Sequence, residues 1–158
     1  MFKEKFRNKN ILITGGTGLI GRQLTDILLD LDANVCVASL DDFNLNSKAS
    51  YVKVDLLDFN SCKNCTKDMD MVFHLAGIKG SIEVTKSKPA TFFVPLLLMN
   101  TNLLEASRLN NVRELVYTSS IGAYHSDEIF REEDSNFEKL PMDMYPGWAK
   151  RMAELQIQ

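Results

Sequence analysis

The segment Thr14-Gly15-Gly16-Thr17-Gly18-Leu19-Ile20-Gly21 decides the fold of this chain. A β-branched run, residues 10–14, precedes it and predicts a buried strand, and apolar residues at helical spacing over residues 19–31 predict a helix. In such a unit Gly15 permits a tight turn, Gly18 lets the backbone approach a pyrophosphate, and Gly21 lets the helix pack on the strand. The helix N-terminus adds free N–H groups and a positive dipole end. A glycine triplet is also compatible with a merely structural turn, but the flanking strand and helix favour phosphate binding.

A nucleoside-triphosphate loop is the obvious competitor for this segment. Gly16 and Gly21 have the GxxxxG spacing of that loop, but Arg22-Gln23 follows where it carries Lys-Ser/Thr. The phosphate-binding lysine and the magnesium-binding hydroxyl are therefore both missing, which excludes this class.

Strands and helices alternate along the rest of the chain. Strands are predicted at residues 34–38, 51–55, 71–77 and 114–118, and helices at residues 58–67 (capped by Asp58), 95–110 and from Pro146 onward. The alternation predicts a single α/β domain over residues 1–158, a Rossmann-like doubly wound parallel sheet of about five strands with right-handed crossovers. The polar segments 41–50 and 126–143 are predicted as loops, and we expect the second to be mobile and near a site.

Composition excludes several classes of protein. Of the 158 residues 45% are apolar and 25% charged, which is typical of a globular domain rather than a disordered or fibrous chain. A net charge of −3 gives no footprint for nucleic acid or a membrane surface. The apolar run 92–99 is too short to span a bilayer, and the charged residues 1–7 lack a signal-peptide core, so we expect a cytoplasmic protein.

Because the chain has an odd number of cysteines, three, it cannot form a disulfide framework with none left over. Cys62 and Cys65 form one CxxC, and the only histidines, His74 and His125, lie on other segments. Because a structural zinc site needs four ligands, small side chains on a helix are favoured over a zinc or redox role.

Two further motifs add to the glycine turn: His74-Leu75-Ala76-Gly77, and Tyr117-Thr118-Ser119-Ser120-Ile121-Gly122-Ala123-Tyr124. Together the three resemble the extended short-chain dehydrogenase/reductase superfamily and, within it, the NAD-dependent epimerase/dehydratase family that acts on nucleotide sugars. The resemblance runs from about Asn10 to Gln158. It implies NAD bound at the carboxyl ends of the strands.

The resemblance also implies which residues contact the cofactor. The diphosphate would lie against Gly15, Gly18, Leu19, Ile20 and Gly21, the adenine beside Asp55 and Leu56, and the ribose over Leu75, Ala76 and Gly77. Lys79 would lie against the cofactor, with a solvated loop lysine as the alternative. Asp55 has a turn or cap role as its alternative, and His74 is expected to be a hydrogen-bonded interior histidine.

The choice between NAD and NADP depends on the end of the second strand. An acidic residue normally binds the adenosine ribose hydroxyls there, and that position falls on Ser39. Asp41 or Asp42 is expected to substitute for it. No arginine for a 2′-phosphate lies between Ala38 and Ser50, so NAD is favoured over NADP.

The family's chemistry, carried over, needs a hydroxyl, a tyrosine base and a lysine that holds the nicotinamide ribose. Ser120 and Lys150 match the first and third, but Pro146 stands where the tyrosine is expected. Tyr145 is therefore the expected base if the helix begins at Pro146 and leaves it free to turn toward Ser120. Its alternative is a loop aromatic that packs near Trp148.

Four departures from the family pattern qualify the expected activity. Ile121 and Gly122 replace the Asp-Glu pair of sugar dehydratases, which leaves an epimerase or a dehydrogenase. Leu96 replaces the family's helix asparagine, and His125 the glycine after Tyr124.

The fourth departure is length, because family members continue past the last helix into a C-terminal domain that grips the sugar. With that domain missing, the chain is expected to be the cofactor-binding half of a longer enzyme. Its alternatives are a non-catalytic dinucleotide-binding module or a truncated gene product, while the intact glycine turn argues against a fragment that binds nothing. Family members also pair through the helices after the fourth and fifth strands, so the apolar run 92–99 is expected to contribute to a homodimer interface.

Overall fold

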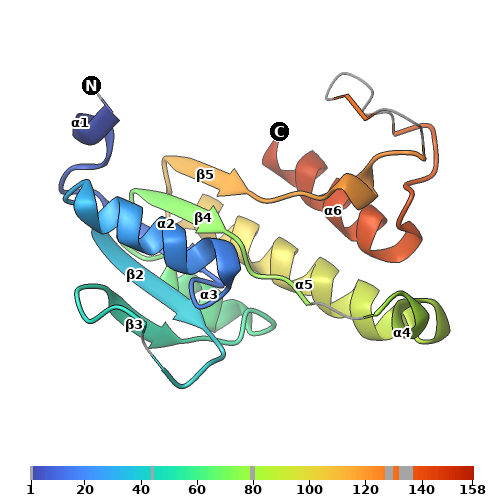
Figure 1. Cartoon of the computed structure of the whole chain (residues 1–158), viewed down its shortest axis with the longest axis horizontal. Helices are drawn as coiled ribbons and strands as arrows, with labels where there is room; N and C mark the ends of the chain where they lie inside the picture. The colour runs from blue at the N-terminus through green and yellow to red at the C-terminus, as the bar shows by residue number, and fades with distance from the viewer. Residues whose placement is uncertain (1, 44, 79–80, 127–129, 132–136) are drawn as a thin grey trace.

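The computed structural model describes residues 2–43, 45–78, 81–126, 130–131 and 137–158. Its core is a sheet of five parallel strands, β1 (Asn10–Thr14), β2 (Asn34–Ser39), β3 (Ser50–Lys53), β4 (Met71–His74) and β5 (Glu114–Tyr117). The strand order β3-β2-β1-β4-β5 confirms the predicted Rossmann-like topology. The chain leaves β1 for β2 on one side and later returns to β4 on the other, so the switch point lies between β1 and β4 (Figure 1).

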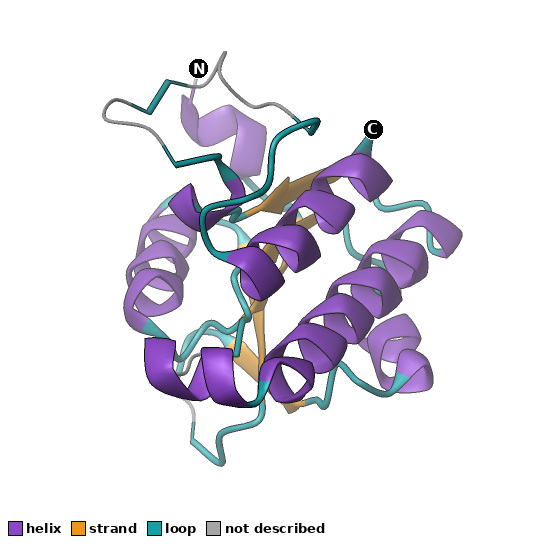
Figure 2. Ribbon diagram, turned by 90° about the vertical axis from the view of Figure 1, so that its right-hand side faces the viewer, coloured by secondary structure: helices purple, strands orange, loops and turns teal. Residues whose placement is uncertain are grey.

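Helices cover both faces of the sheet, as Figure 2 shows in a view onto the carboxyl ends of the strands. Ile11 and Ile13 of β1 point to the face covered by α2 (Leu19–Asp30), where they pack with Leu28. Phe6 of the short helix α1 (Phe2–Phe6) joins the same cluster.

The opposite face is covered by α3 (Phe59–Cys65), α5 (Pro89–Leu109) and α6 (Met144–Ile157). Leu12 of β1 and Val72 of β4 pack there with Leu103 and Ala149. Because the inner strands β1, β2 and β4 are mostly buried, they read as continuous apolar runs in the sequence. Cys62 and Cys65 lie in this core, as expected of small side chains on a helix, and burial raises the pKa of each thiol to about 12.

Several element boundaries differ from the prediction. The fourth strand ends at His74 rather than Gly77, and β3 covers residues 50–53 rather than 51–55. Helix α5 begins at Pro89, six residues before the expected start, and Pro95 lies inside it. Both prolines are typical of a first turn, so the sequence alone did not distinguish them.

Short elements were not predicted at all. These are α1, α4 (Ile82–Ser87) and the single 3₁₀ turn η1 (Ile121–Ala123). The mobility expected of residues 126–143 stays a prediction, and residues 127–129 and 132–136 of that segment lie outside the described residues. Within the part of the chain that the structure describes, no helix is both long and apolar enough to cross a bilayer.

Candidate dinucleotide-binding site

The glycine turn between β1 and α2 is held by two close backbone contacts. Gly15 has φ of +68°, the left-handed region that favours glycine, and a Cβ there would lie 2.9 Å from Cα of Ala76. A Cβ on Gly21 would lie 2.4 Å from the Gly15 carbonyl oxygen and 2.5 Å from Cα of Gly16. The turn is therefore packed between the segment that follows β4 and the first turn of α2, with no space for a larger residue.

Gly18 differs from the other two glycines because it is exposed and less crowded. The nearest atom to a Cβ on Gly18 is the Gly15 carbonyl oxygen at 3.2 Å. Gly18 is the N-cap of α2, and no side chain caps the free N–H groups there. Leu19 and Ile20 follow with 68% and 61% of their surface exposed. The start of α2 is thus accessible to an anionic group at the switch point of the sheet.

The end of β2 carries a hydrogen-bonded cluster of three polar side chains. Thr17 Oγ1 lies 2.9 Å from Ser39 Oγ, and a carboxylate oxygen of Asp41 accepts from both hydroxyls. Asp42 instead pairs with Lys53 on β3. Asp41 and Asp42 were both expected to substitute for the acidic residue that is absent at position 39. Of the two, Asp41 is hydrogen-bonded to the glycine turn, through Thr17.

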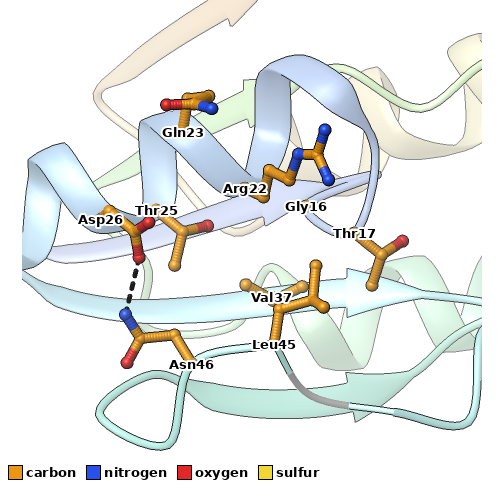
Figure 3. Close-up of a pocket in the computed structure, with 9 residues that line it drawn as sticks. All are labelled: Gly16, Thr17, Arg22, Gln23, Thr25, Asp26, Val37, Leu45 and Asn46. Carbon is orange, nitrogen blue, oxygen red and sulfur yellow. Dashed lines mark hydrogen bonds between the residues drawn. The ribbon is translucent and has the colours of Figure 1, made fainter.

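A shallow hollow of about 240 Å³ lies beside this cluster, between α2, β2 and the loop before β3 (Figure 3). Asn46 Nδ2 donates to Asp26 Oδ1 at 2.6 Å and ties the loop to α2. Arg22 reaches the hollow from α2, and within the described residues its guanidinium forms no ion pair. Arg22 directly follows Gly21, outside the segment 38–50 in which an arginine for a 2′-phosphate would be expected, so its place at this hollow was not predicted.

The segments expected beside adenine and ribose follow β3 and β4. Asp55 Oδ1 accepts from the Leu57 N–H at 2.9 Å, the turn role that was its alternative, and the Leu56 side chain is buried in the core. Any adenine contact by Leu56 would therefore use its backbone. Leu75 and Ala76 are half-buried and Gly77 is exposed. Lys79 lies outside the described residues.

The predicted catalytic hydroxyl lies directly after β5. Ser120 is exposed, and its Oγ accepts from the Gly122 N–H at 3.1 Å at the start of η1. Gly147 of α6 packs on this turn so closely that its Cβ would lie 2.4 Å from the Gly122 carbonyl oxygen. This contact places the N-terminal half of α6 at the end of β5.

Lys150 lies against the end of the same strand. Its Nζ donates to the Thr118 carbonyl oxygen at 2.6 Å and sits 4.5 Å from the centroid of the Tyr117 ring. Burial lowers the pKa of Lys150, and the negative charge of Glu154 partly offsets that effect. Glu154 in turn accepts a hydrogen bond from Ser119.

Tyr145 does not join Ser120 and Lys150 in a hydrogen bond within the described residues. The expectation that the last helix begins at Pro146 is wrong: α6 begins at Met144. The three residues after the N-cap have no intrahelical acceptor for their N–H groups, so Pro146 is tolerated there. Tyr145 is therefore inside the helix, five residues before Lys150 and about 140° away around its axis. Its side chain is 41% exposed.

A buried polar network lies beneath these residues. His74 Nδ1 lies 2.8 Å from Thr14 Oγ1 and its Nε2 lies 3.0 Å from Asn100 Oδ1, which confirms the expected interior histidine. Burial lowers the pKa of His74 to about 4, so the ring is neutral at pH 7. Asn100 Nδ2 then donates to the Tyr117 hydroxyl at 3.0 Å.

A parallel sheet with this strand order and a glycine turn at its switch point defines the class of dinucleotide-binding α/β folds. The comparison with known families is more specific. Residues 11–158 match the NAD dependent epimerase/dehydratase family, and the chain belongs to that family.

Curated relatives and solved structures agree with this assignment. The chain is 29% identical over 157 residues to a putative UDP-glucose 4-epimerase of Methanocaldococcus jannaschii, a match that covers 93% of this chain and 49% of the relative. An epimerase structure from Methanothermobacter thermautotrophicus matches with a TM-score of 0.81 at 26% identity, over 98% of this chain and 48% of that one. The Thermus thermophilus UDP-glucose 4-epimerase, solved with NAD, matches with a TM-score of 0.76 at 27% identity, over 94% and 49%. The chain thus spans about half the length of these proteins.

Proposed function

We propose that this chain is the cofactor-binding half of an NAD-dependent nucleotide-sugar epimerase or dehydrogenase. The observation that carries the proposal is the glycine turn, where Gly15 and Gly21 are closely packed while Gly18 is exposed at the start of α2. The likeness to UDP-glucose 4-epimerases, one of them solved with NAD, supports both the cofactor and the substrate class.

The residues at the carboxyl ends of the strands fit NAD. Its diphosphate would lie against Gly15, Gly18 and the N–H groups of Leu19, Ile20 and Gly21. Asp41 would accept hydrogen bonds from the adenosine ribose hydroxyls, and its negative charge would oppose a 2′-phosphate. The backbone at Asp55 and Leu56 would border the adenine, and residues 75–77, with Lys79, would lie beside the ribose.

Bound NAD would accept hydride from a sugar carbon, and three side chains would act around that carbon. Ser120 would hydrogen-bond the reacting oxygen, Tyr145 would take the hydroxyl proton, and Lys150 would hold the nicotinamide ribose. Tyr124 is another hydroxyl near Ser120, but the resemblance gives it no base role, and it is half-buried and packs edge-on against Phe130, with 6.1 Å between ring centroids. Tyr145 therefore stays the proposed base. A dehydratase is disfavoured, since neither Ile121 nor Gly122 can transfer a proton.

A non-catalytic dinucleotide-binding module is the second candidate. The observation that favours it is the position of Tyr145, which lies on a different side of α6 from Lys150. Such a module would bind NAD without oxidising any sugar.

The absorbance of reduced nicotinamide distinguishes the two candidates. The protein is loaded with NAD, both alone and with a C-terminal domain of the family added, and mixed in turn with UDP-glucose, UDP-galactose and UDP-N-acetylglucosamine. If the protein is an enzyme, at least one sugar should transiently reduce the bound NAD, and the Ser120→Ala variant should lose that reduction. Binding of NAD with no reduction by any of the three sugars would support the binding module instead.

We also propose that two copies pair through α5 and α6. The buried side of α5 includes Phe92, Leu96 and Met99, whereas Val94 and Leu98, one turn apart, are 48% and 47% exposed. Sedimentation equilibrium tests the pairing: a dimer that Leu98→Glu converts to a monomer supports it, and a wild-type monomer at all concentrations contradicts it.

A further inference from the structure

A continuous chain of hydrogen bonds runs under the carboxyl edge of the sheet, from β1 to β5. Thr14, His74 and Asn100 have no more than 1% of their surface exposed, and none of them contacts solvent where a cofactor would bind. The links are Thr14 to His74 at 2.8 Å, His74 to Asn100 at 3.0 Å, and Asn100 to the Tyr117 hydroxyl at 3.0 Å. Removing a polar group from water costs free energy unless the group forms a hydrogen bond inside the protein. The three hydrogen bonds therefore hold these side chains in fixed positions.

The atoms in this chain fix the direction of each hydrogen bond. The Asn100 oxygen only accepts, so neutral His74 donates from Nε2 and accepts at Nδ1 from the Thr14 hydroxyl. Thr14 Oγ1 then has its second position filled by the Ala76 N–H at 3.4 Å. The Asn100 amide donates to Tyr117, so the tyrosine hydroxyl is anchored as an acceptor.

The anchored residue carries the aromatic ring under Lys150. The Tyr117 ring packs against His74 with centroids 5.4 Å apart, and Lys150 Nζ lies 4.5 Å from the centroid of the tyrosine ring. An ammonium group over an aromatic face is attracted by the ring quadrupole, more strongly where both are withdrawn from water. The Thr118 carbonyl supplies a hydrogen-bond acceptor at 2.6 Å. Lys150 therefore has a platform and an acceptor, both from the end of β5.

We propose that Tyr117 is a positioning residue for Lys150. Asn100 holds the Tyr117 side chain in place, and the Tyr117 ring is the platform that sets where the Lys150 ammonium group meets the cofactor. The proposal rests on the proposed function through the role of Lys150 at the nicotinamide ribose. It assigns a task to Tyr117 and Asn100, which would otherwise be interior polar residues.

Two substitutions separate the ring from its anchor. Tyr117→Phe keeps the ring and loses the hydroxyl held by Asn100, whereas Tyr117→Leu loses both. We expect the Leu variant to bind NAD about tenfold more weakly and the Phe variant no more than about threefold, which is within the range of a cation–π contact. Phe73→Leu, an aromatic-to-leucine change on the opposite face of the sheet, is the matched control and should leave the affinity unchanged.

A double-mutant cycle shows whether Tyr117 acts through Lys150. In a Lys150→Met background the Tyr117→Leu change should no longer alter NAD affinity, because the group that it positions is absent. The proposal is overturned if Tyr117→Leu binds NAD as tightly as wild type, or if its full effect persists without Lys150. Should the Leu variant fail to fold, Tyr117→Met, which also lacks the ring, takes its place in the same cycle.

Nuclear magnetic resonance gives a readout that needs no cofactor. Lys150 side-chain protons above an aromatic ring are shifted upfield by its ring current. The shift should persist in Tyr117→Phe and vanish in Tyr117→Leu, and its absence in wild type would overturn the platform. If the shift is present but NAD does not bind to wild type, the proposed function fails while the Tyr117–Lys150 contact stands.

Discussion

Gly147 of α6 rests directly on the carbonyl oxygen of Gly122, with no space between the two backbones for a side chain. The contact fixes the start of α6 to the turn after β5, and so fixes Lys150 relative to Ser120. Gly147→Ala would place its Cβ 2.4 Å from that oxygen and 2.7 Å from Cβ of Pro141.

We expect Gly147→Ala to lower the free energy of unfolding by about 2 kcal/mol, because the helix must move away from the turn. Urea denaturation measures this change. Gly77→Ala is the matched control, since a Cβ there meets no atom within 4 Å and should change stability by less than about 0.5 kcal/mol. Equal stability of the two variants would show that the close approach of α6 is not required.

His74 predicts a specific pH dependence of stability. The pKa of the buried ring is about 4, below the value of about 6.5 in an unfolded chain. Between these values the unfolded chain takes up a proton that the folded chain does not, so stability falls as the pH is lowered from 6.5 to 4. The full contribution is about 3 kcal/mol.

Comparison of wild type with His74→Gln isolates this contribution, because every other titrating group is shared. The difference in unfolding free energy between the two should narrow as the pH falls through this window. A constant difference from pH 7 to pH 4 would mean that His74 titrates normally in the folded protein.

The cysteines of α3 are predicted to be unreactive in the folded state. Cys62 and Cys65 are buried with thiol pKa values of about 12, so almost no thiolate is present at pH 8. Ellman's reagent should label at most Cys36, which is half-buried, until denaturant is added, and a Cys36→Ser variant should not react at all. Rapid labelling of two or more thiols in the native protein would contradict the buried placement of α3.

Substitution of Lys150 is expected to change the affinity for NAD rather than the folding of the protein. Lys150→Met keeps the length of the side chain and removes the charge, so we expect the Kd for NAD to rise at least tenfold, as for loss of a charge-assisted hydrogen bond. Lys63→Met makes the same change on the exposed side of α3 and should have no effect on Kd. Calorimetric titration of both variants compares them directly, and equal Kd values would remove Lys150 from the cofactor site.

The fold was predictable because its decisive features are local. The strand of residues 10–14, the glycines at 15, 18 and 21, and the alternation that follows all depend on short-range periodicity. The boundaries were less accessible: Pro89 and Pro95 are equally typical of a helix start, and only packing of the whole segment on the sheet extends α5 to Pro89.

The buried polar network could not be predicted from the sequence. His74 and Asn100 are 26 residues apart, and no sequence motif links the two. Arg151 is a similar case. A charged residue on the last helix is expected to face water, yet its side chain is buried, donates to the Ala123 carbonyl at 2.6 Å and lies over the Trp148 ring. Asp41 was predicted together with Asp42, and the choice between them needed the hydroxyls of Thr17 and Ser39 in three dimensions.

Thermal unfolding with NAD, with NADP and with neither, for wild type and Gly18→Ala, is the decisive measurement of whether the glycine turn binds a dinucleotide. Gly18 has φ of −74°, and an added Cβ would lie 3.2 Å from the Gly15 carbonyl oxygen, so we expect Gly18→Ala to cost apo stability no more than about 1 kcal/mol. Its methyl group would take up space beside the proposed diphosphate site. We predict that NAD at a hundred times its Kd stabilises wild type by about 2.7 kcal/mol, that NADP does so less, and that Gly18→Ala loses the response. An unchanged melting temperature of wild type with both cofactors would show that the glycine turn of this protein binds neither dinucleotide.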